Sequence, residues 1–394
     1  MERKNTRQLS VGGILIGGNA PVTIQSMTSG YTHEIDSCVA EINRLDEAGA
    51  DIVRVAVPKK EDTLALEHIL PQVSVPIVAD VHFHFQRALE SIEAGVQKIR
   101  LNPGNISDTE QVHKVIDACK DSNIPIRVGV NEGSIVERKD KQKRQQELTK
   151  FFADQKLGHL LALMIAKVEE YLELFEQRDF NDICISAKSM DTRLTIDIYK
   201  ELSNRFDYPL HLGVTHAGPR ETGSIRSITA IGSLLSQGIG DTFRISYASD
   251  SVYEVEDGVE LLNCLGLRER KGVELIACPS CGRIQVDLFS LVNDVQNKLK
   301  DEINLPIKVA VMGCVVNGPG EAEGADVAVF AGNRKGIIYV QGERVANVKE
   351  EEILDRLLLE CKLLQDRVLN GKTKLGEKAC TIVVPEPTVE GKFK

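Results

Sequence analysis

Three cysteines have the spacing of a metal site. Cys278 and Cys281 form a C-x2-C pair within the run CPSCGR, and Cys314 follows the apolar run KVAVMG and opens a glycine-rich turn. Two thiolates separated by two residues can hold one metal centre, and a third from a neighbouring strand end completes a soft three-sulfur face. The chain has nine cysteines, an odd number that argues against a disulfide framework, so this group is interpreted as metal or redox ligands.

The available ligands bear on which metal is bound. A closed structural zinc site takes four cysteine or histidine ligands, and no histidine follows residue 216. Three thiolates with a hard carboxylate suit a [4Fe–4S] cluster with one exchangeable iron, which can also act as a Lewis acid. The remaining cysteines are expected to be inert, because free cysteine usually behaves as a small buried hydrophobe. We expect this of Cys38, Cys119, Cys184, Cys264 and Cys361.

A second group of polar residues stands at the ends of short apolar runs in the first 250 residues. Its members are Arg54, Asp80, His82, Arg100, Asn102, Arg127, Asn131, Lys188, His216 and Arg244. Burying an unpaired cation is costly, so five cations in such positions are hard to explain as core. Arginine offers bidentate recognition of phosphate and lysine adds a point charge, so the group predicts a phosphate site. Internal salt bridges with carboxylates such as Asp80 are the alternative.

The elements that carry these residues alternate between strand and helix. Eight strands are predicted at 22–27, 51–57, 77–81, 98–103, 126–131, 182–188, 210–215 and 242–248, with amphipathic helices between them such as 37–50 and 157–177. Alternation of this kind implies parallel pairing through right-handed crossovers. Eight units suit an α/β fold of the closed (β/α)8 TIM-barrel type, whose sites lie at the carboxyl ends of the strands. An open doubly wound sheet is the alternative.

Two further regions flank the predicted barrel. Residues 8–20 are expected to form a glycine-turned hairpin that could plug the bottom of the barrel, and residues 252–268 a helix leading out of it. A smaller α/β unit follows, with helices at 287–302 and 349–365. The predicted domains are a substrate-binding barrel at 1–265, an iron–sulfur domain at 266–370 and a C-terminal tail at 371–394.

The composition is that of a globular protein, with 394 residues, 42% hydrophobic and 27% charged. There is no apolar run of about 18 residues and no apolar core of a secretory signal, so a cytoplasmic location without membrane contact is expected. The net charge of −10 argues against a general nucleic-acid binder. It does not exclude an anionic small substrate, because local basic residues decide that.

The motifs CPSCGR and MGCVVNGPGEA together resemble the (E)-4-hydroxy-3-methylbut-2-enyl diphosphate synthase family, IspG or GcpE. Barrel motifs agree with this in the expected order, among them GGNAPVTIQSMT, IRLNPGNI, IRVGVNEGS and HLGVT, so the resemblance covers about residues 5–365. It implies a TIM barrel followed by a [4Fe–4S] domain. The implied reaction is reductive ring opening and dehydration of 2-C-methyl-D-erythritol 2,4-cyclodiphosphate, in the non-mevalonate pathway of isoprenoid biosynthesis. Flavodoxin or ferredoxin donates the electrons, and a homodimer closes each cluster domain over the partner's barrel.

The resemblance also implies roles for particular residues. The cluster ligands correspond to Cys278, Cys281, Cys314 and Glu321, and Glu321 is counted among the catalytic residues as well. The diphosphate-binding positions correspond to Arg54, Arg100, Arg127, Asn131 and Lys188.

One departure concerns the proton donor. The family usually has T-E-A-G after the seventh strand, whereas this chain has Thr215-His216-Ala217-Gly218. A histidine can donate a proton near neutral pH, so His216 is the expected acid, with Glu221, five residues on, as the alternative.

Two rival functions remain open at this stage. One is a barrel lyase or aldolase that binds phosphate, forms a Schiff base at Lys188 and uses its cysteines for a structural metal. The other is a non-enzymatic iron–sulfur electron carrier or redox sensor, against which a phosphate-lined barrel argues.

Overall fold

The structure of the protein is a computed structural model. It describes residues 2–82, 84–102, 105–106, 108–135, 143, 146, 155–284, 286–314, 322, 324–332 and 334–376. The chain divides into two compact units, Met1–Arg268 and Glu269–Lys394, which are described separately below. Among the described helices, none is both long and apolar enough to cross a bilayer.

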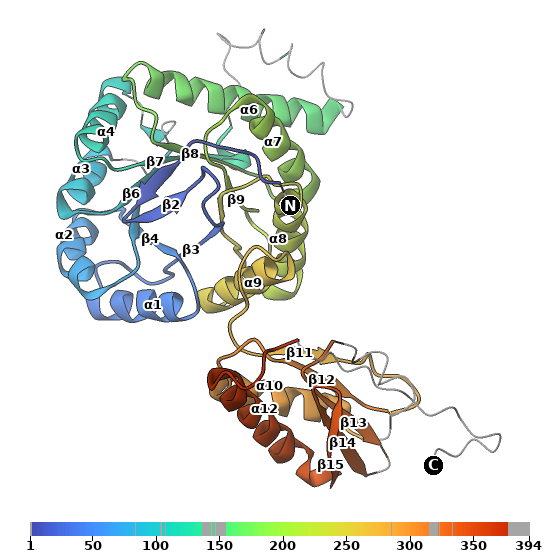
Figure 1. Ribbon diagram of the computed structural model, residues 1–394. Helices are drawn as coiled ribbons and strands as arrows, with labels where there is room; N and C mark the ends of the chain where they lie inside the picture. Colours follow the sequence, from blue (N-terminus) through green and yellow to red (C-terminus); the bar gives the residue numbers. More distant parts are fainter. Residues whose placement is uncertain are drawn as a thin grey trace. The chain divides into compact units, whose positions relative to one another are not determined.

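The first unit is a barrel of eight parallel strands (Figure 1). They are β3 (Thr23–Met27), β4 (Ile52–Ala56), β5 (Ile77–Val81), β6 (Lys98–Leu101), β7 (Ile126–Asn131), β8 (Ile183–Lys188), β9 (His211–Leu212) and β10 (Thr242–Phe243). Hydrogen-bonded neighbours run in the order β8-β7-β6-β5-β4-β3-β10-β9, and a parallel bridge between Ile185 and Leu210 joins the two ends. The predicted barrel is confirmed and the open sheet is excluded.

Helices surround the ring, one after each strand. They are α1 (Ile35–Glu47), α2 (Lys60–Ile69), α3 (Phe85–Ala94), α4 (Thr109–Asp121), α6 (Gln155–Glu176), α7 (Thr192–Arg205), α8 (Arg220–Leu235) and α9 (Ser251–Cys264), with short 3-10 turns η1 (Leu70–Gln72) and η3 (Glu132–Ser134). Three of the helices start at an aspartate whose side chain accepts a hydrogen bond from a first-turn amide: Asp108, Asp191 and Asp250.

Alternation along the strands decides which residues line the barrel. In β4, Val53 and Val55 belong to the apolar layer between strands and helices, whereas Ile52 packs on the opposite side of the strand. Successive side chains of a strand point to opposite faces, so Arg54 faces the interior together with Ile52. The same period places Asp80, Arg100, Arg127 and Lys188 inside the ring, because their strand neighbours belong to the outer apolar layer.

A hairpin closes the amino-terminal end of the barrel. Strands β1 (Leu9–Val11) and β2 (Ile14–Ile16) pair antiparallel around Gly12 and Gly13, which both have positive φ as a tight two-residue turn requires. Apolar side chains of the hairpin pack with Ile52, Val78 and Cys184, near the starts of their strands. The predicted plug is therefore confirmed, and the other end of the barrel carries the polar residues.

The second unit is a five-stranded sheet covered by helices. Its elements are β11 (Glu274–Ala277), α10 (Leu288–Glu302), β12 (Lys308–Met312), β13 (Val327–Gly332), β14 (Lys335–Val340), β15 (Glu343–Lys349), η5 (Glu350–Glu352) and α12 (Ile353–Leu369). The strands lie in chain order, with β11, β12 and β13 parallel and the last two pairings antiparallel. Leu299 of α10 and Leu357 of α12 pack with Val309 in one core.

Candidate active site

Five cations of the barrel interior are the ones that the sequence singled out, and we call them the cation cluster. They are Arg54, Arg100, Arg127, Lys188 and Arg244, from β4, β6, β7, β8 and the residue after β10. Only 1% of Arg127, 6% of Arg100 and 8% of Lys188 is exposed. The register of the strands sets the level of these residues along the barrel axis. Arg100, for example, is the Cα partner of Asp80 on one side and of Arg127 on the other.

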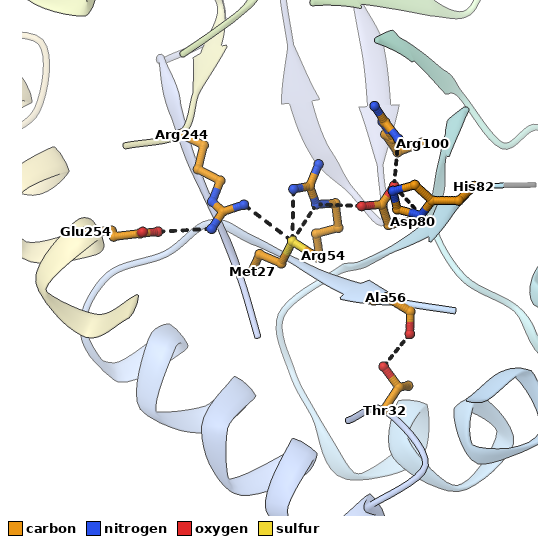
Figure 2. Close-up of polar contacts among 9 residues, drawn as sticks. All are labelled: Met27, Thr32, Arg54, Ala56, Asp80, His82, Arg100, Arg244 and Glu254. Atoms are coloured by element: carbon orange, nitrogen blue, oxygen red, sulfur yellow. Dashed lines mark hydrogen bonds and ion pairs between the residues drawn. The ribbon is translucent and has the colours of Figure 1, made fainter. Parts of the chain in front are cut away.

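Asp80 holds two members of the cluster (Figure 2). Its Oδ1 lies 3.2 Å from Nη1 of Arg100, and its Oδ2 lies 3.6 Å from Nε of Arg54. The Nδ1 atom of His82 lies 4.0 Å from the same Oδ1. Burial alone would raise the pKa of Asp80, but Arg54 and Arg100 overcome this and lower it to about 2, so the carboxylate is charged.

A second carboxylate, Glu254 of α9, pairs with Arg244. Its Oε2 lies 3.3 Å from Nη2 of Arg244, and its Oε1 accepts a hydrogen bond from the backbone amide of Tyr247 at 2.9 Å. Burial raises the pKa of Glu254, and Arg244 opposes this shift. This residue is not among those predicted from the sequence. The available signal was its position on the apolar face of the helix, at helical spacing from Ser251 and Gly258, where an acid requires a partner.

The cluster carries more positive charge than its carboxylates balance. Among the described residues, neither Arg127 nor Lys188 has a carboxylate within ion-pair distance, and Nε and Nη1 of Arg127 are buried without a hydrogen-bond partner. Burial, with Arg127 next, lowers the pKa of Lys188 well below its usual value. Burial, followed by Arg100, lowers the pKa of Arg127 to about 10. Salt bridges thus explain part of the group, and an anionic ligand would satisfy the rest.

Two glycines make room for these side chains. A Cβ atom on Gly213 would lie 2.6 Å from Nζ and 2.9 Å from Cε of Lys188, and 3.0 Å from the carbonyl oxygen of Arg244. A Cβ atom on Gly129 would lie 3.1 Å from Nε of Arg100. The absence of a side chain at these two positions therefore leaves room in the barrel interior for Lys188 and Arg100.

The two predicted asparagines also lie at the carboxyl ends. Asn102 follows β6 and is buried, with 3% of its surface exposed. Asn131 ends β7 and is the Cα partner of Lys188.

The two candidate acids lie on the loop between β9 and α8 and on that helix. His216 is exposed, has φ of +53°, and its Nδ1 lies 3.1 Å from the hydroxyl of Thr215. Glu221 is exposed in the first turn of α8. Neither forms a hydrogen bond or ion pair with the cation cluster in the described part of the chain.

In the second unit, the cysteine motifs leave neighbouring parallel strands at the same edge. Ala277, the last residue of β11, is the Cα partner of Val311 in β12, so Cys278 and Cys314 both follow the carboxyl ends of adjacent strands. The Sγ atom of Cys278 accepts a hydrogen bond from the amide of Gly313 at 3.3 Å. Cys281 is exposed and Cys314 half-buried.

The ligand set is not assembled among the described residues. No three His, Cys, Asp or Glu side chains of that part of the chain come together closely enough to hold a metal ion. Glu321 lies outside the described residues, as does the predicted tail beyond residue 376.

The other cysteines behave as expected with one exception. Cys38, Cys119, Cys184 and Cys361 are buried, and burial raises the pKa of Cys38 and of Cys361 to about 12. The expectation was wrong for Cys264, which is exposed in the last turn of α9 and donates a hydrogen bond to Oε1 of Glu260 at 3.4 Å. That turn faces away from the barrel core, which Leu261 and Leu262 contact instead.

Comparison with known proteins identifies the family. Residues 6–259 match the GcpE TIM-barrel domain and residues 274–363 match the GcpE protein C-terminal domain. A protein of Symbiobacterium thermophilum named 4-hydroxy-3-methylbut-2-en-1-yl diphosphate synthase (flavodoxin) is 46% identical over 358 residues, which are 91% of this chain and 93% of that protein. Proteins of the same name from Caldanaerobacter subterraneus subsp. tengcongensis and Macrococcus caseolyticus are 44% and 43% identical, over 91% and 92% of this chain and 97% and 94% of their own lengths. The family resemblance inferred from the motifs is confirmed, and the chain belongs to the GcpE family.

Proposed function

We propose that this protein is a flavodoxin-dependent 4-hydroxy-3-methylbut-2-en-1-yl diphosphate synthase. It opens the ring of 2-C-methyl-D-erythritol 2,4-cyclodiphosphate by two-electron reduction with loss of water, and so supplies isoprenoid precursors in the non-mevalonate pathway. The observation that carries the proposal is a barrel interior in which five buried or half-buried cations have, among the described residues, two carboxylate partners, Asp80 and Glu254. The relatives' shared name agrees with a diphosphate substrate and a flavodoxin donor.

Different residues of the barrel interior have different roles in substrate binding. Arg127 and Lys188 lack carboxylate partners in the described structure and burial lowers the pKa of both, so a bound diphosphate is the counter-charge that favours their charged forms. Asp80 fixes the side chains of Arg54 and Arg100, which limits the rotamer entropy lost when the substrate binds. Asn102, Asn131 and His82 lie at the carboxyl ends of β6, β7 and β5 and supply further hydrogen-bonding groups.

The donor set suits a [4Fe–4S] cluster. Cys278 and Cys314 leave one sheet edge, and with Cys281 they are the described cysteines of the second unit that lie outside full burial. They would hold the cluster together with Glu321. When bound, the cluster supplies electrons one at a time and an iron that polarises an oxygen ligand.

The hydroxyl that departs as water requires a proton from the chain. We assign this role to His216, which lies on the loop after β9 at the carboxyl-end face of the barrel. Glu221 is the alternative. We further propose a cytoplasmic homodimer in which the cluster domain closes over the partner's barrel, a property implied by the family.

An anaerobic assay tests the function. The purified holoenzyme is supplied with the cyclodiphosphate and reduced flavodoxin, then reduced ferredoxin, and the diphosphate product is quantified. Conversion by a brown, iron-containing protein supports the proposal. A colourless zinc protein that fails to convert the substrate, and in which borohydride traps a carbonyl compound on Lys188, would show the rival lyase or aldolase instead.

A further inference from the structure

The sulfur of Met27 lies between two guanidinium groups of the cation cluster. Nε and Nη2 of Arg54 lie 3.1 and 2.9 Å from Sδ, and Nη1 of Arg244 lies 3.3 Å from the same atom. Figure 2 shows Met27 at the centre of this arrangement, with Asp80 beyond one arginine and Glu254 beyond the other. Three N–H groups, two from Arg54 of β4 and one from Arg244 just after β10, thus converge on one thioether.

The backbone places the methionine there. Met27 is the last residue of β3 and the Cα partner of Arg54 in β4, and the amide of Thr28 donates to the carbonyl oxygen of Arg54 at 3.0 Å. On the other side, β10 pairs with β3 and ends one residue before Arg244. The side chain at position 27 therefore lies between the two arginines and contacts both.

The important property of this acceptor is that it carries no charge. A thioether sulfur is a weak, polarisable and neutral acceptor. A carboxylate at this position would pair with both arginines and cancel one positive charge, whereas an aliphatic side chain would leave the N–H groups without a partner. Methionine orients the two cations and leaves their charge available.

We propose that Met27 is a positioning residue that holds Arg54 and Arg244 on either side of one neutral acceptor, so that both cations are oriented towards the diphosphate without any negative charge beyond that of Asp80 and Glu254. This deepens the proposed function, on which it rests for the identity of the natural ligand. It assigns to the methionine a role that depends on neutrality and acceptor capacity together.

Three substitutions separate these two properties. Met27→Leu keeps the approximate shape and removes the acceptor, Met27→Gln keeps a neutral acceptor, and Met27→Glu provides a charged one. In the holoenzyme, titration calorimetry with inorganic pyrophosphate measures anion affinity, and thermal unfolding measures stability. We expect affinity to fall about tenfold in Met27→Leu and to stay within about threefold of wild type in Met27→Gln.

The Met27→Glu variant gives the most specific outcome. Its carboxylate pairs with the arginines, so we expect an unchanged or higher Tm together with affinity weakened on the order of 100-fold. A purely structural methionine would make affinity and stability change in the same direction. Equal pyrophosphate affinity in the Leu, Gln and Glu variants would overturn the proposal.

Two controls complete the test. Met164→Leu makes the same chemical change at a buried methionine of α6, in the apolar layer, and should leave pyrophosphate affinity unchanged. Met27→Leu should have little further effect in an Arg54→Ala, Arg244→Ala background, because the groups it orients are gone. Undiminished weakening in that background would also overturn the proposal.

The proposal and the function fail in different ways. If wild-type holoenzyme does not convert the cyclodiphosphate but binds pyrophosphate in a Met27-dependent manner, the proposed function is wrong and the positioning role stands. If it converts the substrate and Met27→Leu matches wild type in KM and in pyrophosphate affinity, the positioning role is wrong and the function stands.

Discussion

Nη1 of Arg100 lies 3.2 Å from Oδ1 of Asp80, and both side chains are almost completely buried. The pKa of Asp80 is held at about 2, below its value of about 3.9 in an unfolded chain. This depressed pKa stabilises the fold by about 2 kcal/mol above pH 4, and the contribution is lost as the pH falls towards 2. Urea unfolding should therefore show wild type more stable than Asp80→Asn at pH 6, with the difference shrinking as the pH approaches 2. Parallel pH profiles would refute the assignment.

Replacing Lys188 by methionine should weaken substrate binding and increase the stability of the fold. Its pKa in the fold lies well below the unfolded value, so wild-type stability should rise as the pH increases towards about 10, while the variant lacks this rise. Without a buried cation, Lys188→Met should unfold at a higher temperature at pH 7 and bind substrate roughly 10- to 150-fold more weakly. Calorimetry and steady-state kinetics measure the two effects. A lower Tm for Lys188→Met than for wild type would contradict the conclusion that Lys188 is buried without a carboxylate partner.

Three arginines of the cation cluster provide a comparison series for Lys188. Arg54→Ala, Arg100→Ala and Arg127→Ala should also raise KM or lower kcat/KM strongly, in the same range of roughly 10- to 150-fold. If these variants and Lys188→Met all kept wild-type kinetics, the diphosphate would have to bind elsewhere.

Gly213→Ala should weaken substrate binding without touching the substrate. The added methyl group overlaps the position of Nζ of Lys188, so the ammonium must move. We expect KM to rise about tenfold, the loss of one charged hydrogen bond. The matched control is Gly232→Ala in α8, whose Cβ would approach only Cδ1 of Leu261, at 3.3 Å, among nearby atoms. In a Lys188→Met background most of the effect should disappear; an undiminished effect would show that the glycine acts through the backbone of Arg244 instead.

Removing any of the three cysteines at the sheet edge should remove the cluster. Cys278→Ser, Cys281→Ser and Cys314→Ser should each lose iron, visible absorption and activity together, because a serine oxygen is a poor ligand for a soft metal site. Cys264→Ser is the control, since that thiol is exposed on α9 and its variant should keep its iron. Glu321→Ala should retain three thiolates and show a damaged or oxygen-sensitive cluster. Four irons per subunit in one of the cysteine variants would remove that residue from the ligand set.

His216→Ala should lower kcat by about 10²–10⁴ while the iron content stays unchanged, because proton delivery is lost. His216→Glu should restore much of the activity. His68→Ala, at an exposed histidine of α2, is the matched control and should be silent. If His216→Ala is nearly silent and Glu221→Gln is inactive, the acid lies five residues downstream.

The barrel was predictable because its signals are local. The strands at 77–81 and 126–131 were predicted with the bounds that β5 and β7 have, since β-branched runs between helical patterns mark buried parallel strands. The last two strands were predicted too long, at 210–215 and 242–248, against two residues each in β9 and β10. Apolar patterning reports burial, which continues through Val214 and Ile245, whereas a strand also requires hydrogen-bonded neighbours.

The site was predictable in its cations and not in the groups that hold them. Their positions at or near the ends of predicted strands identified Arg54 and Arg244, but the sulfur and the carboxylate beside them depend on which chain segments meet. Met27 contacts Arg244 although the two residues are 217 positions apart in the sequence. Glu254 contacts the same arginine from α9, a helix outside the ring of strands. Such contacts follow from closure of the barrel, which no local pattern encodes.

The lack of a side chain at Gly213 also determines the order in which positions 188 and 213 can change during evolution. While Lys188 is present, its ammonium occupies the volume that any larger residue at 213 would need. A lineage that first loses the lysine is then free to enlarge position 213, whereas the reverse order passes through an impaired intermediate. The two positions are therefore expected to change in one direction, and among descendants of this barrel, alanine at 213 should accompany the absence of lysine at 188.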